Sequence, residues 1–121
     1  MSAPVMHFHF TARDRRKLAS FYAGVFGWEP AEFAELGYTK LQTASTCGID
    51  GGVSEAGALP AGVMVYAQVE DVEASLAMAL SLGGRQLMEP YDIPGVGRFA
   101  VFSDPEGNGM GLWKVETTGG R

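Results

Sequence analysis

Two histidines, the only ones in the chain, stand two residues apart in the segment VMHFHF, residues 5–10. Strand residues two apart share a face of the sheet, so His7 and His9 could approach one ligand together. Imidazoles bind metals, transfer protons and form hydrogen bonds. A stable zinc site takes at least three protein ligands, so the pair alone does not make one. A partial metal site and the wall of a ligand pocket both remain open.

The element that carries the histidines has the alternation of a strand over residues 5–12. Asp14 is placed to cap a following helix, and Gly27 to end it. One face of the strand holds Met6, Phe8, Phe10 and Ala12, and the other holds Val5, His7, His9 and Thr11. The apolar stripe expected to face the sheet from the helix is Leu18, Phe21, Tyr22, Val25 and Phe26. The histidines are therefore expected on the sheet face that points away from the helix.

The same arrangement recurs in residues 62–84, where a strand precedes Asp71 and a second apolar helix. Asp14 and Asp71, like Gly27 and Gly84, are 57 residues apart, which indicates an internal duplication. Three short strands are expected after each helix: about 28–33, 38–42 and 48–54, then 85–88, 98–103 and 109–115. We therefore predict one α+β domain of two strand–helix–three-strand modules, about 5–54 and 62–115, joined by a linker at 55–61.

A second set of side chains is expected on the face of the second module that points away from its helix. Met64, Tyr66 and Gln68 alternate with apolar residues, and Trp113 shares a face with Gly109 and Gly111. Such an amphipathic set suits a small organic ligand. The alternative is a collapsed interior that its own side chains fill.

The composition of the chain limits the classes of partner that we expect it to bind. The chain has 121 residues and a net charge of −5, with no basic run that could follow a phosphate backbone, so we expect no nucleic-acid partner. No apolar stretch approaches the roughly 20 residues that span a bilayer. Cys47 is the single cysteine, which excludes an internal disulfide, and we expect it to be an inert thiol in a cytoplasmic protein.

The ordered motifs HFHFTARDRRKLASFYAGVFGW, VYAQVEDVEASLAMALSLGG and IPGVGRFAVFSDPEGNGMGLW resemble the vicinal oxygen chelate superfamily. This superfamily contains glyoxalase I, extradiol dioxygenases, and the bleomycin and fosfomycin resistance proteins. The resemblance covers nearly the whole chain. It implies two βαβββ modules that form curved mixed sheets around a cup, and it implies a homodimer.

The resemblance also locates the positions of the usual metal ligands. His7 matches the first ligand, whereas the second falls on Met64 and the last on Gly111. The remaining position lies within GIDGG, where Asp50 is the only carboxylate. We therefore expect no cofactor. An unorthodox divalent-metal site of His7, His9 and Asp50 is the disfavoured alternative.

The function that these observations favour is binding of a small organic molecule in the cup, without the usual metal. The predicted pocket consists of His7, His9, Asp50, Met64, Tyr66, Gln68 and Trp113. The alternative is a glyoxalase-like lyase or isomerase acting on a small oxygenated substrate. His7 or His9 would then be its acid or base, and Tyr66 its hydrogen-bond donor. A third hypothesis is a protein that retains only interactions with other proteins.

Overall fold

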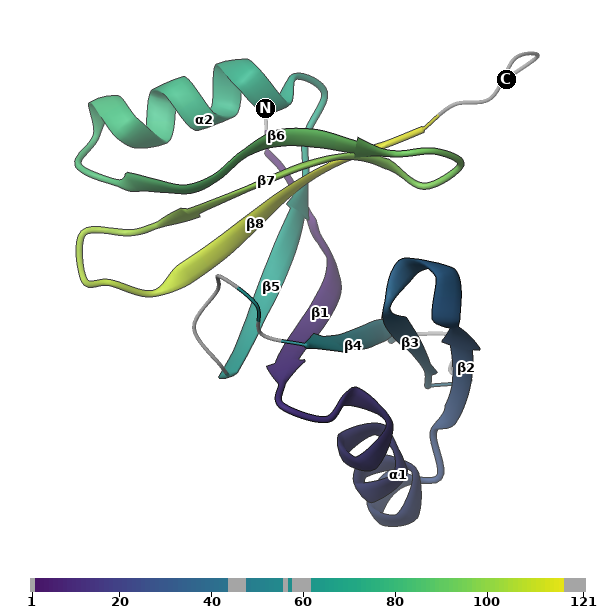
Figure 1. Ribbon diagram of the computed structural model, residues 1–121. Coiled ribbons are helices and arrows are strands. Elements are labelled where there is room, and N and C mark those ends of the chain that lie inside the picture. Colours follow the sequence, from purple (N-terminus) through teal and green to yellow (C-terminus); the bar gives the residue numbers. More distant parts are fainter. Residues whose placement is uncertain (1, 44–47, 56, 58–61, 117–121) are drawn as a thin grey trace. The chain divides into compact units, whose positions relative to one another are not determined.

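The computed structural model describes residues 2–43, 48–55, 57 and 62–116. Cys47 and most of the predicted linker lie outside these residues. The chain divides into two compact units, residues 6–64 and residues 1–5 with 65–121 (Figure 1). Each unit is described by itself.

The first unit follows the order strand, helix, three strands. Its elements are β1 (Val5–Ala12), α1 (Arg15–Phe26), β2 (Glu29–Phe33), the short 3-10 helix η1 (Ala34–Leu36), β3 (Tyr38–Gln42) and β4 (Gly51–Glu55). The strands lie in the order β2-β3-β4-β1. β1 and β4 are parallel, and the other pairs are antiparallel. α1 packs against β2, β3 and β4.

The second unit repeats this plan. Its elements are β5 (Gly62–Gln68), whose first three residues belong to the first unit, α2 (Val72–Ser81), β6 (Arg85–Ile93), β7 (Gly97–Ser103) and β8 (Gly109–Val115). The strand order is β5-β8-β7-β6, with β5 and β8 parallel. α2 packs along β6, β7 and β8, as Figure 1 shows. The predicted α+β fold with two βαβββ modules and mixed strand pairing is confirmed. β6 extends five residues beyond the predicted strand, through two irregularities in its pairing with β7.

The predicted helix caps are present. The Asp14 carboxylate accepts a hydrogen bond from the Lys17 backbone N–H at 3.1 Å, and the Asp71 carboxylate accepts one from the Ala74 N–H at 3.0 Å. Gly27 ends α1 in the left-handed conformation, with φ of 75°. This backbone conformation carries little steric cost for glycine. In the described part of the chain neither helix is long and apolar enough to cross a membrane.

Each unit has its own apolar core between helix and sheet. In the first unit the core is Ala19, Leu41 and Val53, with Phe8, Phe10 and Trp28 packed against it. In the second unit it is Val72, Leu76, Ala100 and Leu112, with Val69 and Phe102 at its margin. Phe8 and Phe10 of β1 therefore face α1, as their alternation in the sequence predicts.

The apolar stripe predicted for α1 is partly wrong. Phe21, Val25 and Phe26 are 59%, 55% and 59% exposed. The fully buried residue of this helix is Ala19, at 1% exposed. A small side chain at the contact lets a helix approach its sheet closely, so the helix is rotated toward Ala19 and leaves the larger side chains in solvent.

We predict that Gly51→Ala destabilises the first unit. An added Cβ at Gly51 would overlap the Phe8 ring, which packs against the core. The expected loss in unfolding free energy is about 1–3 kcal/mol, as for other overpacked sites. Urea denaturation measures it.

The matched control is Gly24→Ala in α1, where an added Cβ meets no atom within 4 Å. Because alanine is the better helix former, this control should gain roughly 0.5–1 kcal/mol. Equal effects of the two substitutions would contradict the predicted overlap with Phe8.

Candidate functional site

The sheet face of the first unit that points away from α1 carries the two histidines. Strand pairing places His9 beside Gly52 and Thr11 beside Ser54. It also places Lys40 beside Gly52 and Tyr38 beside Ser54. Paired residues point to the same side of a sheet. We call His7, His9, Tyr38, Lys40 and Ser54 the polar face.

The two imidazoles and a hydroxyl form a hydrogen-bonded chain. His9 Nε2 lies 2.8 Å from Ser54 Oγ, and His9 Nδ1 lies 3.4 Å from His7 Nε2. The ring centroids of the two histidines are 5.6 Å apart. Both nitrogens of His9 are thus engaged, which fixes its ring orientation and couples its tautomer to that of His7.

Tyr38 lies flat against His9. Their ring centroids are 5.9 Å apart and the ring planes differ by 4°. The tyrosine ring covers the backbone of Gly52, where a Cβ would collide with it, and its hydroxyl donates to the Gly51 carbonyl oxygen at 3.4 Å. Burial raises the pKa of Tyr38 to about 12, so the phenol is protonated at neutral pH.

Burial also keeps the imidazoles uncharged. Only 9% of His9 is exposed. Desolvation lowers the pKa of His9 to about 4, and the neighbouring His7 contributes. The pKa of His7 is lowered to about 4 by desolvation first and by the positive charge of Lys40 second, while the Asp50 carboxylate opposes the shift. At neutral pH both histidines therefore present one N–H donor and one acceptor nitrogen each.

Asp50 lies close enough to act electrostatically on both His7 and Tyr38. Its carboxylate is engaged by Thr43, whose backbone N–H donates to Oδ1 at 3.0 Å and whose hydroxyl donates at 3.2 Å. These two bonds join Thr43, which directly follows β3, to Asp50, which directly precedes β4. Asp50 is accordingly a structural anchor at the margin of the polar face.

The residues at the superfamily's metal-ligand positions do not fit a divalent ion. Gly111 has no donor atom, and the Tyr66 ring covers the space that a side chain there would need. Met64 offers a thioether, a poor ligand for hard or borderline metals. Within the described residues, no three His, Cys, Asp or Glu side chains are grouped to hold a metal.

The second unit carries an aromatic face opposite α2. Strand pairing aligns Gln68, Trp113, Phe99 and Tyr91 across β5, β8, β7 and β6. The Phe99 ring stacks on Trp113 at 6.0 Å and on Tyr91 at 5.7 Å. Tyr66 meets Phe99 edge to face at 5.8 Å. We call Tyr66, Tyr91, Phe99 and Trp113 the aromatic face.

Hydrogen bonds hold two of these rings. The Trp113 indole N–H donates to the Val96 carbonyl oxygen at 3.3 Å. Burial raises the pKa of Tyr91, and a hydrogen bond with Tyr66 opposes that shift. Gly111 leaves no open space on this face, because the Tyr66 ring lies over it.

The seven predicted pocket residues thus divide between the units. His7, His9, Asp50 and Met64 belong to the first, and Tyr66, Gln68 and Trp113 belong to the second. That they line a single pocket stays a prediction. Tyr38, Lys40 and Ser54 were not among the predicted site residues. The alternation of residues 38–42 indicates that Tyr38 and Lys40 share a face, but it does not by itself say which face points away from α1.

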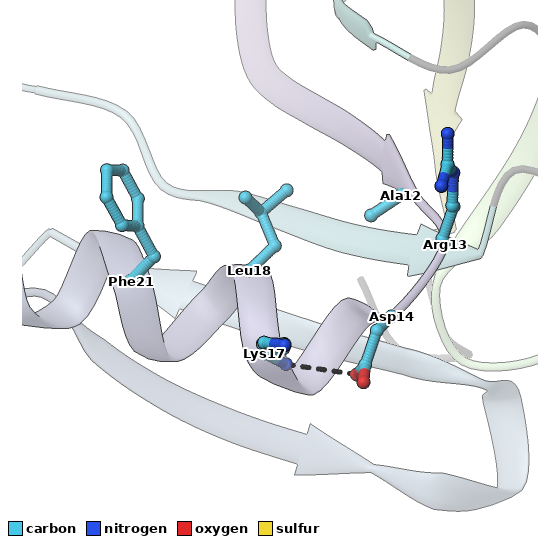
Figure 2. A pocket seen from close by; sticks show the side chains of 6 residues that line it. All are labelled: Ala12, Arg13, Asp14, Lys17, Leu18 and Phe21. Atoms are coloured by element: carbon cyan, nitrogen blue, oxygen red, sulfur yellow. Dashed lines mark hydrogen bonds between the residues drawn. The ribbon is translucent and has the colours of Figure 1, made fainter.

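Two hollows lie elsewhere on the molecule. One, of about 330 Å³, lies where β1 meets α1 and is lined by Ala12, Leu18 and Phe21 with charged residues of the first turn. Figure 2 shows that Asp14 is turned back to the helix backbone, so it is used as a cap. The other, of about 420 Å³, is apolar and lies beneath α2, against Val69, Met78 and Leu112. His7, His9, Tyr66 and Trp113 line neither hollow.

Two sequence relatives bear on this geometry. The anthracycline biosynthesis protein DnrV of Streptomyces peucetius is 30% identical over 124 residues, which cover 88% of this chain and 45% of that protein. The putative glyoxylase CFP32 of Mycobacterium tuberculosis is 56% identical over 43 residues, covering 36% of this chain and 16% of that protein. The chain thus spans less than half the length of these curated relatives.

A solved structure and a family model agree on the fold. The methylmalonyl-CoA epimerase of M. tuberculosis superposes with a TM-score of 0.62 at 14% identity, covering 93% of this chain and 88% of that one. Residues 7–113 match the model of the glyoxalase-like domain. The chain therefore belongs to the glyoxalase-like domain family, within the vicinal oxygen chelate superfamily.

Proposed function

We propose that this protein binds a small organic molecule at the polar face, without a divalent metal. The observation that carries the proposal is the partly buried chain of hydrogen bonds from His7 through His9 to Ser54. Uncharged donors and acceptors on a half-buried face suit recognition of oxygen atoms on an otherwise apolar ligand. The flat Tyr38 ring beside His9 adds a surface on which a planar group can stack.

The alternative is the glyoxalase-like lyase or isomerase, with His7 or His9 as acid or base and Tyr66 as donor. A general base works best when its pKa lies near the operating pH. Imidazoles with a pKa of about 4 are neutral at pH 7, yet they are weak bases. The lowered pKa values therefore favour hydrogen bonding to a ligand over proton abstraction.

The relatives narrow the ligand class. Two of the curated relatives, DnrV and DauV of Streptomyces species, are described as anthracycline biosynthesis proteins. We therefore propose a planar, oxygenated ring compound as the ligand of this chain.

A further proposal concerns assembly and location: a homodimer in the cytoplasm. The exposed Phe21, Val25 and Phe26 of α1 support association, because such side chains gain from burial against a partner. The single cysteine suits a reducing compartment.

We predict that light scattering at micromolar concentration gives twice the chain mass of 12.9 kDa. Val25→Glu should shift the protein toward monomer, because a buried unpaired charge opposes association. Lys17→Glu, on the exposed first turn of the same helix, is the control. A purely monomeric wild type would contradict the proposed dimer.

We predict that both histidines titrate near pH 4. The chain holds only two, so histidine-labelled protein without an affinity tag reports them alone by NMR. Below pH 6.5 the unfolded chain, whose histidines have a pKa near 6.5, binds protons that the folded chain does not bind. The free energy of unfolding is therefore at its maximum above pH 6.5 and decreases as the pH falls toward 4. The expected loss is about 1 kcal/mol per histidine between pH 7 and 5.5.

In this pH range the expected change in the free energy of unfolding comes from the histidines and not from the carboxyl groups. The carboxyl groups with lowered pKa values, such as Glu32 and Asp104, have ordinary values of 4.5 or less and destabilise the protein only at lower pH. His9→Gln should remove about half of the slope between pH 6.5 and 5. Histidine midpoints near 6.5 would contradict the buried, neutral state.

We predict that hydroxylated naphthalenes and anthraquinones bind and shift the ring signals of His7 and His9. By calorimetry, His9→Ala should weaken binding about tenfold, as expected for a lost buried hydrogen-bonding group. Dialysis against a chelator should leave binding unchanged.

The control is Lys17→Ala. Arg15 is unsuitable, because its guanidinium pairs with both Glu32 and Glu55 and joins α1 to β2 and β4. If no member of the panel shifts a histidine signal, the binding proposal is wrong. Binding that chelation abolishes would instead favour a metal.

A further inference from the structure

Lys40 occupies an unusual position among the cations of this chain. Arg15, Arg16 and Arg98 are each paired with carboxylates. The unpaired cations of the described residues are otherwise exposed: Arg13, Lys17, Arg85 and Lys114. Lys40 alone in that part of the chain is half-buried with no carboxylate within 4 Å. An ammonium that has no carboxylate partner can form a charge-assisted hydrogen bond with a bound anion.

Strand register directs this ammonium to the polar face. Lys40 on β3 pairs with Gly52 on β4, and Gly52 pairs with His9 on β1, so the side chains of Lys40 and His9 share one row and one side. The Tyr38 ring lies over the intervening Gly52, so it stands between the two side chains on this face. The influence of Lys40 on His7 agrees with this placement.

The groups around Lys40 are mostly uncharged at neutral pH. The Tyr38 phenol is protonated and donates to the Gly51 carbonyl oxygen, and both nitrogens of the neutral His9 are engaged. Asp50 is the nearby negative charge, and its Oδ1 accepts hydrogen bonds from the backbone N–H and the hydroxyl of Thr43. Lys40 and Asp50 form no ion pair, so the carboxylate does not take up the ammonium.

We propose that the ligand of the polar face carries an anionic oxygen, such as a carboxylate or an ionised phenol, and that Lys40 binds this oxygen beside His7 and His9. This inference rests on the proposed binding function and adds the charge of the ligand to it. Lys40 thereby supplies a fixed positive charge on a site whose histidines remain neutral. Charge-assisted hydrogen bonds of this kind are stronger than neutral ones, so a ligand with the anionic group is preferred over its neutral analogue.

The test compares 1-hydroxy-2-naphthoate with 1-hydroxy-2-naphthamide, which match in shape and differ in charge. Calorimetry at pH 7.5 measures affinity, and the two histidine ring signals report whether the polar face is the binding place. The naphthoate should bind about tenfold more tightly than the amide, consistent with a single charge-assisted contact. Lys40→Gln should remove this preference and leave binding of the amide within about twofold.

Two further variants make the result specific. Lys40→Arg keeps the charge and should retain the preference for the naphthoate. Lys17→Gln removes a lysine from α1, on the other side of the same sheet, and should change neither affinity. Thermal unfolding of Lys40→Gln checks that its fold is intact, and the amide serves as an internal check on the site.

The outcomes separate the two proposals. If naphthoate and amide bind equally and shift the histidine signals, or if Lys40→Gln keeps the preference, the assignment of Lys40 is wrong while the binding function stands. If neither compound nor any other of the panel shifts these signals, both proposals are wrong. A preference for the naphthoate that Lys40→Gln abolishes and Lys40→Arg restores supports the inference.

Discussion

Two adjacent glycines on β4, Gly51 and Gly52, leave the space that the aromatic rings on both faces of the first unit occupy. Gly51 points toward α1 and is covered by the Phe8 ring, whereas Gly52 points away and is covered by the Tyr38 ring. Any side chain at either position would overlap a ring. Because successive strand residues face opposite sides, one short segment clears space for the core and for the polar face together. The stacking of Tyr38 on His9 follows from the absence of a side chain at Gly52.

The second module also has a glycine of its last strand under an aromatic ring, but the ring comes from a different strand. His9 and Tyr66 stand 57 residues apart at equivalent positions of β1 and β5, and each pairs with a glycine of the last strand of its module. In the first module Tyr38 from β3 fills the space over Gly52, which leaves the imidazole hydrogen-bonded to Ser54. In the second module Tyr66 itself fills the space over Gly111. The duplicated backbone therefore presents polar groups in one copy and packed rings in the other.

The fold could be predicted from the sequence because its signals are local. Asp14, Gly27 and Asp71 act at helix ends, and alternation assigns the phenylalanines of β1 to the helix side. The rotation of α1 was not predictable in this way. Phe21, Val25 and Phe26 have helical spacing, but the buried contact is made by Ala19, whose small size allows close approach. Hydrophobicity alone ranks the larger side chains first, so the pattern predicted the wrong face.

The site was predictable only where one strand's alternation was enough. His7 and His9 were assigned together, and they do lie together. Ser54, Tyr38 and Lys40 join them through strand register, which depends on how β1, β4 and β3 pair. β4 is parallel to β1 and antiparallel to β3, and no turn motif in the sequence specifies that combination. Asp50 acts electrostatically on His7 and Tyr38, but its hydrogen bond with Thr43, at 3.0 Å, depends on how the residues after β3 and before β4 meet, which the sequence does not specify.

The packing around position 111 limits which side chains can stand there. The Cβ of any larger residue in place of Gly111, such as glutamate, would overlap the Tyr66 ring. Tyr66 is 5% exposed, packs edge to face on Phe99 and is hydrogen-bonded to Tyr91. Displacing it would therefore disturb a set of rings that stabilise one another through burial and orientation. A side chain at position 111 and the buried Tyr66 ring therefore compete for the same space. A variant at position 111 must first find room for its own side chain.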